Sequence, residues 1–252
     1  MGEAGFGRRA AARLLTSSGP EASRGRLTYG RRRSRTLRPG QRTLISGLLA
    51  RVALSLAESG SLDPGMLFGG LRQSIWLEIG FGGGEHLALQ AEHHPQIGLI
   101  GCEVFENGIA KLLARIAHRH LENIRVFSDD ARLLIAALPA ASIDRVFILF
   151  PDPWPKRRHH RRRIVSHETL DGLAEIMTDN AELRLATDDC DYLCWMLERV
   201  TDHPAFEWLA RRPSNWHERP QDSPPTRYEE KARAAGRCPT FLRVRRRPRI
   251  HG

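Results

Sequence analysis

The chain has 252 residues and a formal net charge of +10, with 27% charged and 41% hydrophobic residues. That length is enough for a full core and favours one α/β domain with appendages over two equal domains. The four cysteines are too few and too scattered for a disulfide scaffold, and no apolar run approaches the length of a membrane span. We therefore expect no disulfide framework, no membrane span and a cytoplasmic location.

The positive charge is concentrated in three blocks. Residues 1–43 carry +9, residues 156–163 carry +6 and residues 243–249 carry +5, whereas the rest of the chain carries −10. Basic blocks on an acidic body are typical of a nucleic-acid footprint, and the alternative is a set of solvated arginines without a partner. The charge distribution favours a polyanionic partner.

Residues 1–43 are rich in Gly, Ser and Arg with little apolar periodicity, which predicts a basic, mobile N-terminal arm. Residues 44–58 repeat apolar residues at helical spacing and predict a helix at the start of a single domain that spans 44–252. Strands and helices then alternate regularly. The predicted strands cover 75–79, 97–102, 124–127, 146–150 and 183–187, and the predicted helices cover 85–92, 107–120, 131–138, 166–178 and 190–200.

This alternation predicts an α/β fold with a doubly wound, mostly parallel sheet. Residues 206–210 and 240–246 have the pattern of two further strands, which we expect to form an antiparallel pair at one edge. Cys190 and Cys194 are spaced to share a metal on a helix, but no other ligands stand at a recognisable spacing. We therefore expect reduced, packed thiols and no metal.

The first predicted strand leads into a glycine-rich turn, E-x-G-x-G-x-G, from Glu78 to Gly84. Its glycines, which include Gly80 and Gly82, let the backbone turn tightly and approach a ligand at the start of the next helix. A dinucleotide fingerprint needs its third glycine at position 85, where Glu85 stands instead. A carboxylate at Glu78 suits a cationic ligand with an amino acid head, such as S-adenosylmethionine, better than a diphosphate.

The next two strand ends also carry acids. Glu103 follows the second strand, 19 residues after Gly84, where an acid accepts hydrogen bonds from ribose hydroxyls in nucleoside-binding folds. Asp129 and Asp130 end the third strand, where an acid could accept a hydrogen bond from an adenine amino group. The alternative is that these acids cap the helices that follow.

The fourth strand stops at Pro151 and Pro153, which cannot continue a central ladder, so Asp152 and Trp154 lie on a turn at its carboxyl end. Ligands bind at that edge in open α/β sheets. Trp154 could stack on an extruded base, or it could be a packing wedge that fixes the turn. The sequence RRHHRRR follows directly, and its last residues, Arg161, Arg162 and Arg163, are suited to phosphate contacts.

Several segments together resemble the bacterial tRNA (guanine-N7)-methyltransferases. The similar segments are WLEIGFGGGEHL at 76–87, GCEV at 101–104, DDAR at 129–132, FPDPWPKRRHHRRR at 150–163, LATD at 185–188 and TRYEEKARAAG at 226–236. The resemblance covers about residues 30–247. It implies a class I Rossmann-like fold, S-adenosylmethionine as the cofactor, and methylation of N7 of the guanine at position 46 in the variable loop of tRNA.

The resemblance also implies roles for single residues. Asp152 is then the catalytic residue, in an enzyme that is a monomer or a homodimer. The cofactor-binding residues are Glu78, Gly80, Gly82, Glu103, Asp130 and Asp152, and the substrate-binding residues are Lys156, Asp188, Thr226, Arg227, Tyr228 and Glu229. Taken alone, Asp188 could instead cap the next helix, and Thr226 with Glu229 has the spacing of an ordinary capping box.

Two other hypotheses stay open. One is a methyltransferase that acts on exocyclic amines, although a single proline separates Asp152 from Trp154 where that motif has two. The other is a nonenzymatic RNA-binding module or a nicotinamide oxidoreductase on the same topology, which Glu85 and the strand-end acids disfavour.

Overall fold

The computed structural model describes residues 36–56, 62–70 and 73–250, and most of the predicted arm lies outside these ranges. The first helix, α1 (Pro39–Val52), begins before residue 44, because Pro39 suits its first turn and the Gln41 side chain accepts a hydrogen bond from the Arg38 amide at 3.0 Å. It ends at Val52, short of the predicted 58, because Leu54 donates to the carbonyl oxygen of Val126 and so joins the edge of the sheet.

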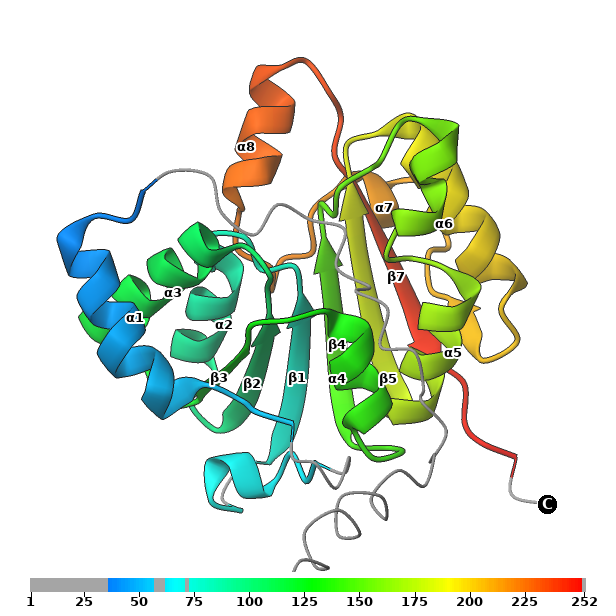
Figure 1. The fold of residues 1–252 in the computed structure, drawn as a ribbon. Coiled ribbons are helices and arrows are strands. Elements are labelled where there is room, and N and C mark those ends of the chain that lie inside the picture. Colours follow the sequence, from blue (N-terminus) through cyan, green and yellow to red (C-terminus); the bar gives the residue numbers. More distant parts are fainter. Residues whose placement is uncertain (1–35, 57–61, 71–72, 251–252) are drawn as a thin grey trace, which may run out of the picture.

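A seven-stranded sheet forms the centre of the molecule, with the strand order β3-β2-β1-β4-β5-β7-β6 (Figure 1). The pairs among β1 to β5 are parallel, and β7 runs antiparallel to both β5 and β6. The doubly wound, mostly parallel sheet and the antiparallel pair are confirmed. The strands are β1 (Ser74–Ile79), β2 (Ile97–Cys102), β3 (Ile124–Phe127), β4 (Ile143–Leu149), β5 (Met177–Thr187), β6 (Phe206–Trp208) and β7 (Thr240–Arg246).

After α1, five helices follow the predicted ranges to within two residues at each end, and two further short helices near the C-terminus have no counterpart among those ranges. They are α2 (Glu85–His93), α3 (Glu106–Arg119), α4 (Ala131–Ala137), α5 (His167–Ile176), α6 (Cys190–Asp202), α7 (Ser214–His217) and α8 (Arg227–Ala234), with short 3-10 turns η1 (Met66–Phe68) and η2 (Arg157–Arg162). Two strands begin earlier than predicted, β4 at Ile143 rather than 146 and β5 at Met177 rather than 183, because Ile143 pairs with Met177 ahead of a register shift. Among the described residues, no helix is both long and apolar enough to cross a membrane.

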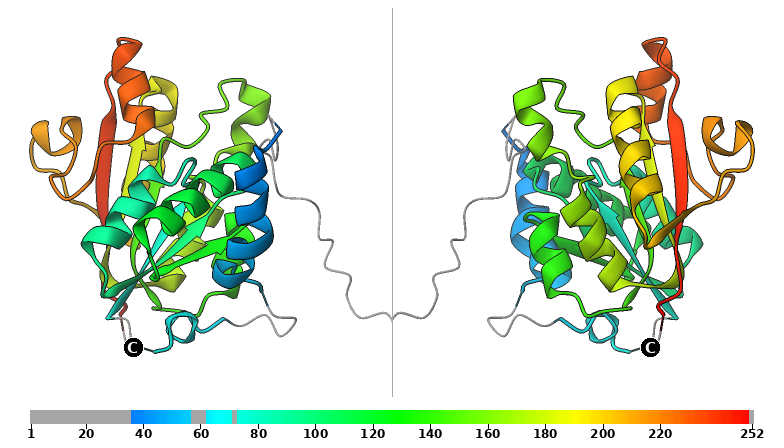
Figure 2. Two further views of the ribbon diagram at one scale, coloured as in Figure 1. Left: turned by 90° about the vertical axis from the view of Figure 1, so that its left-hand side faces the viewer. Right: turned by 90° about the vertical axis from the view of Figure 1, so that its right-hand side faces the viewer.

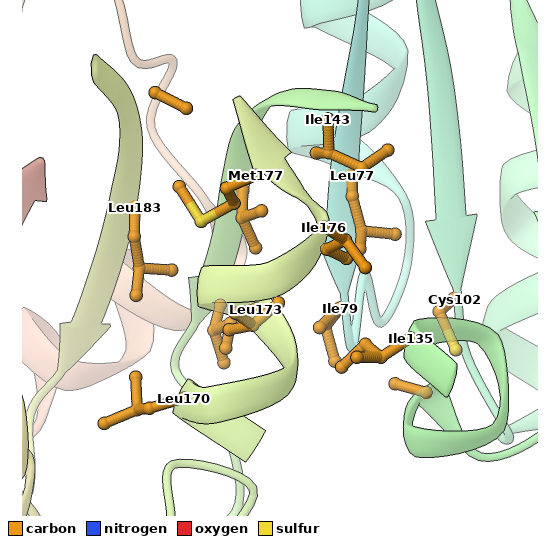
Figure 3. Close-up of a cluster of buried hydrophobic side chains, with 14 of the residues drawn as sticks. Leu77, Ile79, Cys102, Ile135, Ile143, Leu170, Leu173, Ile176, Met177 and Leu183 are labelled. Atoms are coloured by element: carbon orange, nitrogen blue, oxygen red, sulfur yellow. The ribbon is translucent and has the colours of Figure 1, made fainter. Parts of the chain in front are cut away.

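Apolar side chains cover both faces of the sheet. On one face, α4, α5 and α6 pack on the sheet through residues such as Leu77, Leu173 and Met177 (Figure 3). On the other face, α2 and α3 pack on it, and α1 lies against α3. Val146 and Phe147 of β4 are at most 1% exposed and belong to opposite clusters, so this strand is buried on both sides, as its continuous apolar run predicts.

The strand order reverses between β1 and β4, which lie side by side with Ile79 opposite Ile148. The chain leaves these two strands in opposite directions, and such a switch point opens a crevice at the carboxyl ends of the strands. In Figures 1 and 2, α8 stands at that edge of the sheet and the described C-terminal residues lie at the opposite edge.

Candidate active site

A cavity of about 440 Å³ lies at the carboxyl ends of β1, β2, β3 and β4. This volume is within the range of sites for cofactors and other small molecules. Its lining includes the carboxylates of Glu103, Asp129, Asp130 and Asp152. A concave site with this many acids favours a ligand that brings positive charge, hydroxyl groups or amino groups. No cluster of three or more potential metal ligands occurs in the described part of the chain.

The glycine turn forms one wall of this cavity. Gly80, Gly82 and Gly84 all have positive φ, at 75°, 56° and 73°, which a residue with a side chain rarely adopts. The turn also lies directly against the first turn of α3. A Cβ atom at Gly108 would be 2.2 Å from the carbonyl oxygen of Gly82. Gly108 therefore supports the turn, and no sequence signal sets it apart from other helical glycines.

Glu103 connects the glycine turn to the end of β2. Its Oε2 accepts a hydrogen bond from the amide of Gly82 at 2.8 Å, and its Oε1 accepts from the amides of Val104 at 2.8 Å and Phe105 at 2.9 Å. Burial raises the pKa of Glu103, the three amides lower it, and Asp152 raises it further, so that the pKa lies above that of an ordinary glutamate. Since a carboxylate has about four lone-pair sites, one remains for a ligand hydroxyl.

Asp130 caps a helix, pairs with the Arg132 guanidinium and also lines the cavity. Its Oδ1 accepts from the amide of Arg132 at 2.9 Å and caps α4, and the same side chain lines the cavity. Cys102, which the sequence analysis did not select, also lines the cavity, and its thiol donates to the carbonyl oxygen of Asp129 at 3.1 Å. Burial, followed by Glu103 and the two aspartates, raises the pKa of Cys102 well above its usual range. The cavity therefore holds a neutral thiol beside its acids.

Glu78 lies outside the cavity lining. It is 4% exposed, and its Oε2 is 2.7 Å from Nδ1 of His86, the second residue of α2. The His86 ring packs on Phe147 with the ring centroids 4.7 Å apart. The carboxylate thus ties the end of β1 to α2 beneath the glycine turn.

The turn after β4 has a strained backbone. Phe150 and Trp154 both lie in the left-handed region, with φ of 52° and 46°. This conformation costs roughly 1–2 kcal/mol for each residue other than glycine, and such strain tends to occur at functional sites. Between them, Asp152 is exposed, lines the cavity and makes no hydrogen bond or ion pair with any residue that the structure describes. The strained turn holds an unpaired carboxylate at the cavity.

Trp154 is both a cavity wall and a packing residue. Its indole lines the cavity, and the guanidinium carbon of Arg162 lies 4.9 Å from the ring centroid. His159 approaches the indole edge-on at 5.9 Å. Burial and the neighbouring Arg162, Arg158 and Lys156 lower the pKa of His159. Packing of Trp154 that fixes the turn is therefore compatible with an indole surface at the cavity for an extruded base.

The basic segment after this turn divides into exposed and buried residues. Lys156, Arg157, Arg158 and Arg161 are exposed. Arg163 is 1% exposed, so the prediction of a phosphate contact is wrong for this residue.

The third basic block does not lie near the cavity. Three of its five arginines are paired within the protein: Arg243 binds Glu182, and Arg246 and Arg249 bind Asp179. Because β7 is antiparallel, Thr240 lies opposite Thr187 near the cavity edge, and the chain then runs to the far edge of the sheet (Figure 1). The pairing argues against a footprint that includes Arg243, Arg246 and Arg249, whereas Arg245 and Arg247 are exposed.

The segment around α8 combines a helix cap with a wall of the cavity. Thr226 Oγ1 accepts from the amide of Glu229 at 3.1 Å and caps α8, while Glu229 is buried against Arg219 and Arg233. Tyr228 lines the cavity and packs on the glycine turn, since a Cβ atom at Gly82 would be 2.9 Å from its ring. Burial, then Glu103 and Asp152, raises the pKa of Tyr228. Arg227 is exposed.

Asp188 also lies outside the lining and accepts a hydrogen bond from Arg237 Nε at 2.6 Å. The cap of α6 is provided by Asp189, whose Oδ1 accepts from the amide of Tyr192 at 2.8 Å. The structure thus gathers part of the predicted site in one cavity. Gly80, Gly82, Glu103, Asp130, Asp152 and Tyr228 line it, whereas Glu78, Lys156, Asp188, Thr226, Arg227 and Glu229 do not.

A doubly wound sheet with a glycine turn and a strained proline turn at its switch point is a Rossmann-like fold, and the comparisons identify the class as methyltransferase. Residues 72–241 match the protein family described as "Putative methyltransferase". The chain is similar to the structure titled 16S rRNA methyltransferase KamB, with a TM-score of 0.55 and 15% identity over 77% of this chain and 96% of that one. A similar TM-score, 0.50, relates it to a 16S rRNA (adenine(1408)-N(1))-methyltransferase from Catenulisporales acidiphilia, solved with the cosubstrate SAM, at 16% identity over 76% of this chain and 95% of that one. These structures support the fold alone.

Curated relatives are much closer in sequence. The tRNA (guanine-N(7)-)-methyltransferase of Rhodospirillum rubrum is 50% identical over 224 residues, covering 88% of each chain. The enzyme of the same name from Paramagnetospirillum magneticum is 50% identical over 223 residues, covering 88% of this chain and 93% of that one. The chain belongs to the bacterial tRNA (guanine-N(7)-)-methyltransferase family. This membership favours the tRNA methyltransferase hypothesis over an oxidoreductase or a nonenzymatic RNA-binding module.

Proposed function

We propose that this protein transfers a methyl group from S-adenosylmethionine to N7 of the guanine at position 46 in the variable loop of tRNA, in the cytoplasm. The observation that carries the proposal is the convergence of Glu103, Asp130 and Asp152 on one cavity at the switch point. The relatives named for this activity support the choice of tRNA and of guanine N7.

The residues present fit the cofactor. Glu103 and Asp130 end successive strands and offer carboxylate oxygens to ribose hydroxyls and to an adenine amino group. The neutral thiol of Cys102 and the apolar Ile79 and Phe105 provide a surface for the base. Glu78 bonds to His86, so its part in this proposal is to set the glycine turn rather than to touch the ligand. When bound, S-adenosylmethionine would supply an electrophilic methyl group on a positively charged sulfur.

Methylation at N7 does not require a general acid or a general base. N7 of guanine already has an in-plane lone pair and no proton, so no general base is required before the N–C bond forms. As that bond forms, the bond from the methyl carbon to sulfur would break with its electron pair going to sulfur, and the positive charge would move onto the purine. The carboxylate of Asp152, held without a partner at the cavity, stabilises that charge and orients the base against Trp154.

The substrate side of the proposal uses the cavity mouth. Tyr228 closes the cavity over the glycine turn, and the exposed Lys156, Arg157 and Arg158 lie beside Trp154 along the chain, where phosphates of the tRNA would meet them. Asp188, Thr226, Arg227 and Glu229 are proposed to shape this mouth from outside the lining.

The test is single-turnover methylation of tRNA by Asp152→Asn, with S-adenosylmethionine and tRNA both saturating. We expect the rate to fall about a hundredfold or more, the scale of losing one preorganised electrostatic group. The tRNA affinity should change less than tenfold, because removing a negative charge does not weaken attraction to a polyanion. Mass analysis of the tRNA nucleosides should show 7-methylguanosine, and a tRNA with adenine at position 46 should yield none.

The matched control is Asp202→Asn, which neutralises an exposed carboxylate at the end of α6, away from the cavity. It should methylate at the wild-type rate. A near-normal rate for Asp152→Asn would remove Asp152 from the chemical step, and a wild-type protein that forms no 7-methylguanosine would overturn the proposed function itself.

A further inference from the structure

Arg163 is the last residue of the basic segment, yet it is the most deeply buried arginine of that segment. Only 1% of its surface is exposed, whereas Arg157, Arg158 and Arg161 are exposed. Burial of a charged side chain is costly unless the charge is paired and hydrogen-bonded. The contacts of this guanidinium therefore indicate what it does.

The Arg163 guanidinium has partners on several sides. Its Nε donates to the carbonyl oxygen of Pro153 at 2.8 Å, and its Nη2 binds the carboxylate of Asp191. The guanidinium carbon lies 4.8 Å from the ring centroids of both Tyr192 and Trp195. This fork of donors with aromatic contacts is a geometry that lysine cannot reproduce.

The carbonyl that Arg163 binds belongs to the strained turn. Pro153 lies between Asp152 and Trp154, and Trp154 and Phe150 both have positive φ. A backbone in this conformation persists only where the surroundings over-determine it. The bond from Arg163 fixes the peptide unit between Pro153 and Trp154, one residue beyond Asp152, and so restricts how the turn that carries Asp152 can move.

The other side of Arg163 is fixed to the core. The next buried residue, Val165, accepts a hydrogen bond at its carbonyl oxygen from Trp195 Nε1 at 2.6 Å and donates its amide to the Tyr192 hydroxyl at 3.3 Å. Tyr192 is fully buried in α6. Arg163 is thus a bridge between a packed helix and the turn that carries Asp152.

We propose that Arg163 is a positioning residue that holds the Asp152 turn in its reactive conformation, and that it makes no contact with the RNA. This inference rests on the proposed function, because it names the part of the site that sets the rate of methyl transfer. It predicts a loss of rate with no loss of phosphate contacts.

The experiment compares Arg163→Lys and Arg163→Met with Arg161→Met, which removes the same charge from an exposed position of the same segment. Single-turnover rates at saturating S-adenosylmethionine and tRNA, and the salt dependence of tRNA affinity, are measured for each. Arg163→Met should lower the rate at least tenfold and leave the salt slope unchanged, and Arg163→Lys should fall between it and the wild type. Arg161→Met should make the slope shallower by about 0.7–0.9, the value of one phosphate contact.

Arg245→Met is the far-edge control. Arg245 is exposed on β7, away from the cavity, so both its rate and its slope should match the wild type. If Arg163→Met does not fold, the rate and salt slope of Arg163→Lys test the inference. Thermal unfolding should show that Arg163→Lys is native at the assay temperature. A normal rate for a folded Arg163→Lys, or a shallower slope for either Arg163 variant, would overturn the inference, whereas an inactive wild type would count against the proposed function only.

Discussion

Arg184 holds both carboxylate oxygens of Asp222, with Nη1 at 2.8 Å from Oδ1 and Nη2 at 2.7 Å from Oδ2. Arg184 is in β5 and 4% exposed, and Asp222 is in the loop that leads to α8. Gln90 of α2 also donates to the carbonyl oxygen of Asp222 at 3.0 Å. These bonds fix the start of the segment that brings Tyr228 to the glycine turn.

Asp222→Ala should therefore destabilise the protein and loosen Tyr228. Because Arg184 keeps Glu182 as a partner at 2.9 Å, we expect a loss of about 1–3 kcal/mol in the free energy of unfolding, the cost of one under-satisfied buried polar group. Urea unfolding measures this, and Asp202→Ala should be neutral. If Asp222→Ala lowers the free energy of unfolding no more than Asp202→Ala does, the Arg184–Asp222 pair contributes nothing to stability.

The pH dependence of the Arg184–Asp222 pair follows from the pKa of Asp222. Burial raises the pKa of Asp222, but hydrogen bonds from Arg184 outweigh burial, so the pKa lies below its usual value. A lowered carboxyl pKa gives stability that is fully present above the unfolded-state pKa and is lost as the pH falls through the folded-state pKa. The difference between wild type and Asp222→Ala should accordingly be constant near neutrality and shrink only in acid.

Glu103, whose pKa is raised rather than lowered, should make cofactor binding sensitive to pH. Burial raises its pKa, so it takes up a proton at a higher pH than an ordinary glutamate, and the protonated form offers fewer acceptor sites to a ribose. We expect the affinity for S-adenosylmethionine to fall as the pH is lowered through this raised pKa. Calorimetry on Glu103→Gln should show affinity weaker by about 1.5–3 kcal/mol near neutral pH. The same acid-side loss in the glutamine variant would mean that another group titrates.

Two helical glycines should respond oppositely to alanine. A Cβ atom added at Gly47 in α1 would meet nothing within 4 Å, whereas a Cβ at Gly108 in α3 would be 2.2 Å from the Gly82 carbonyl oxygen. Gly47→Ala should raise the free energy of unfolding by roughly 0.5–1 kcal/mol, because alanine is the better helix former. Gly108→Ala should displace the glycine turn and weaken S-adenosylmethionine binding at least tenfold. Equal cofactor affinity in the two variants would refute the close approach.

The sequence predicts the elements of this fold well because strand and helix periods alternate cleanly, and the buried run at Val146–Phe147 identifies the central strand. It also points to the strand-end acids, since carboxyl ends of parallel strands meet at one edge. Contacts between distant segments are not encoded in a local pattern. Tyr228 meeting Gly82, and Gly108 meeting the same residue, depend on how α8 and α3 pack.

The arginines show most directly what a local sequence pattern does not predict. Arg161 and Arg163 look alike in the sequence, yet one is exposed and the other is buried under the Asp152 turn. The outcome depends on Tyr192 and Trp195 of α6, which pack against only one of them. Similarly, the shift in the start of α1 depends on a proline and a single glutamine side chain, which periodicity cannot detect.

The placement of β7 has a consequence for how the protein meets its substrate in solution. Because β7 runs against its neighbours, it carries its arginines to the far edge, where Asp179 and Glu182 neutralise several of them, while the exposed cations of η2 remain beside the cavity. Within the described part of the chain, three of the five arginines at 243–249 are thus offset by carboxylates, whereas Arg157, Arg158 and Arg161 keep their charges exposed at the end that holds the active site. This asymmetry orients the protein relative to the RNA as the two diffuse together, so that a larger share of collisions begins with the cavity facing the RNA.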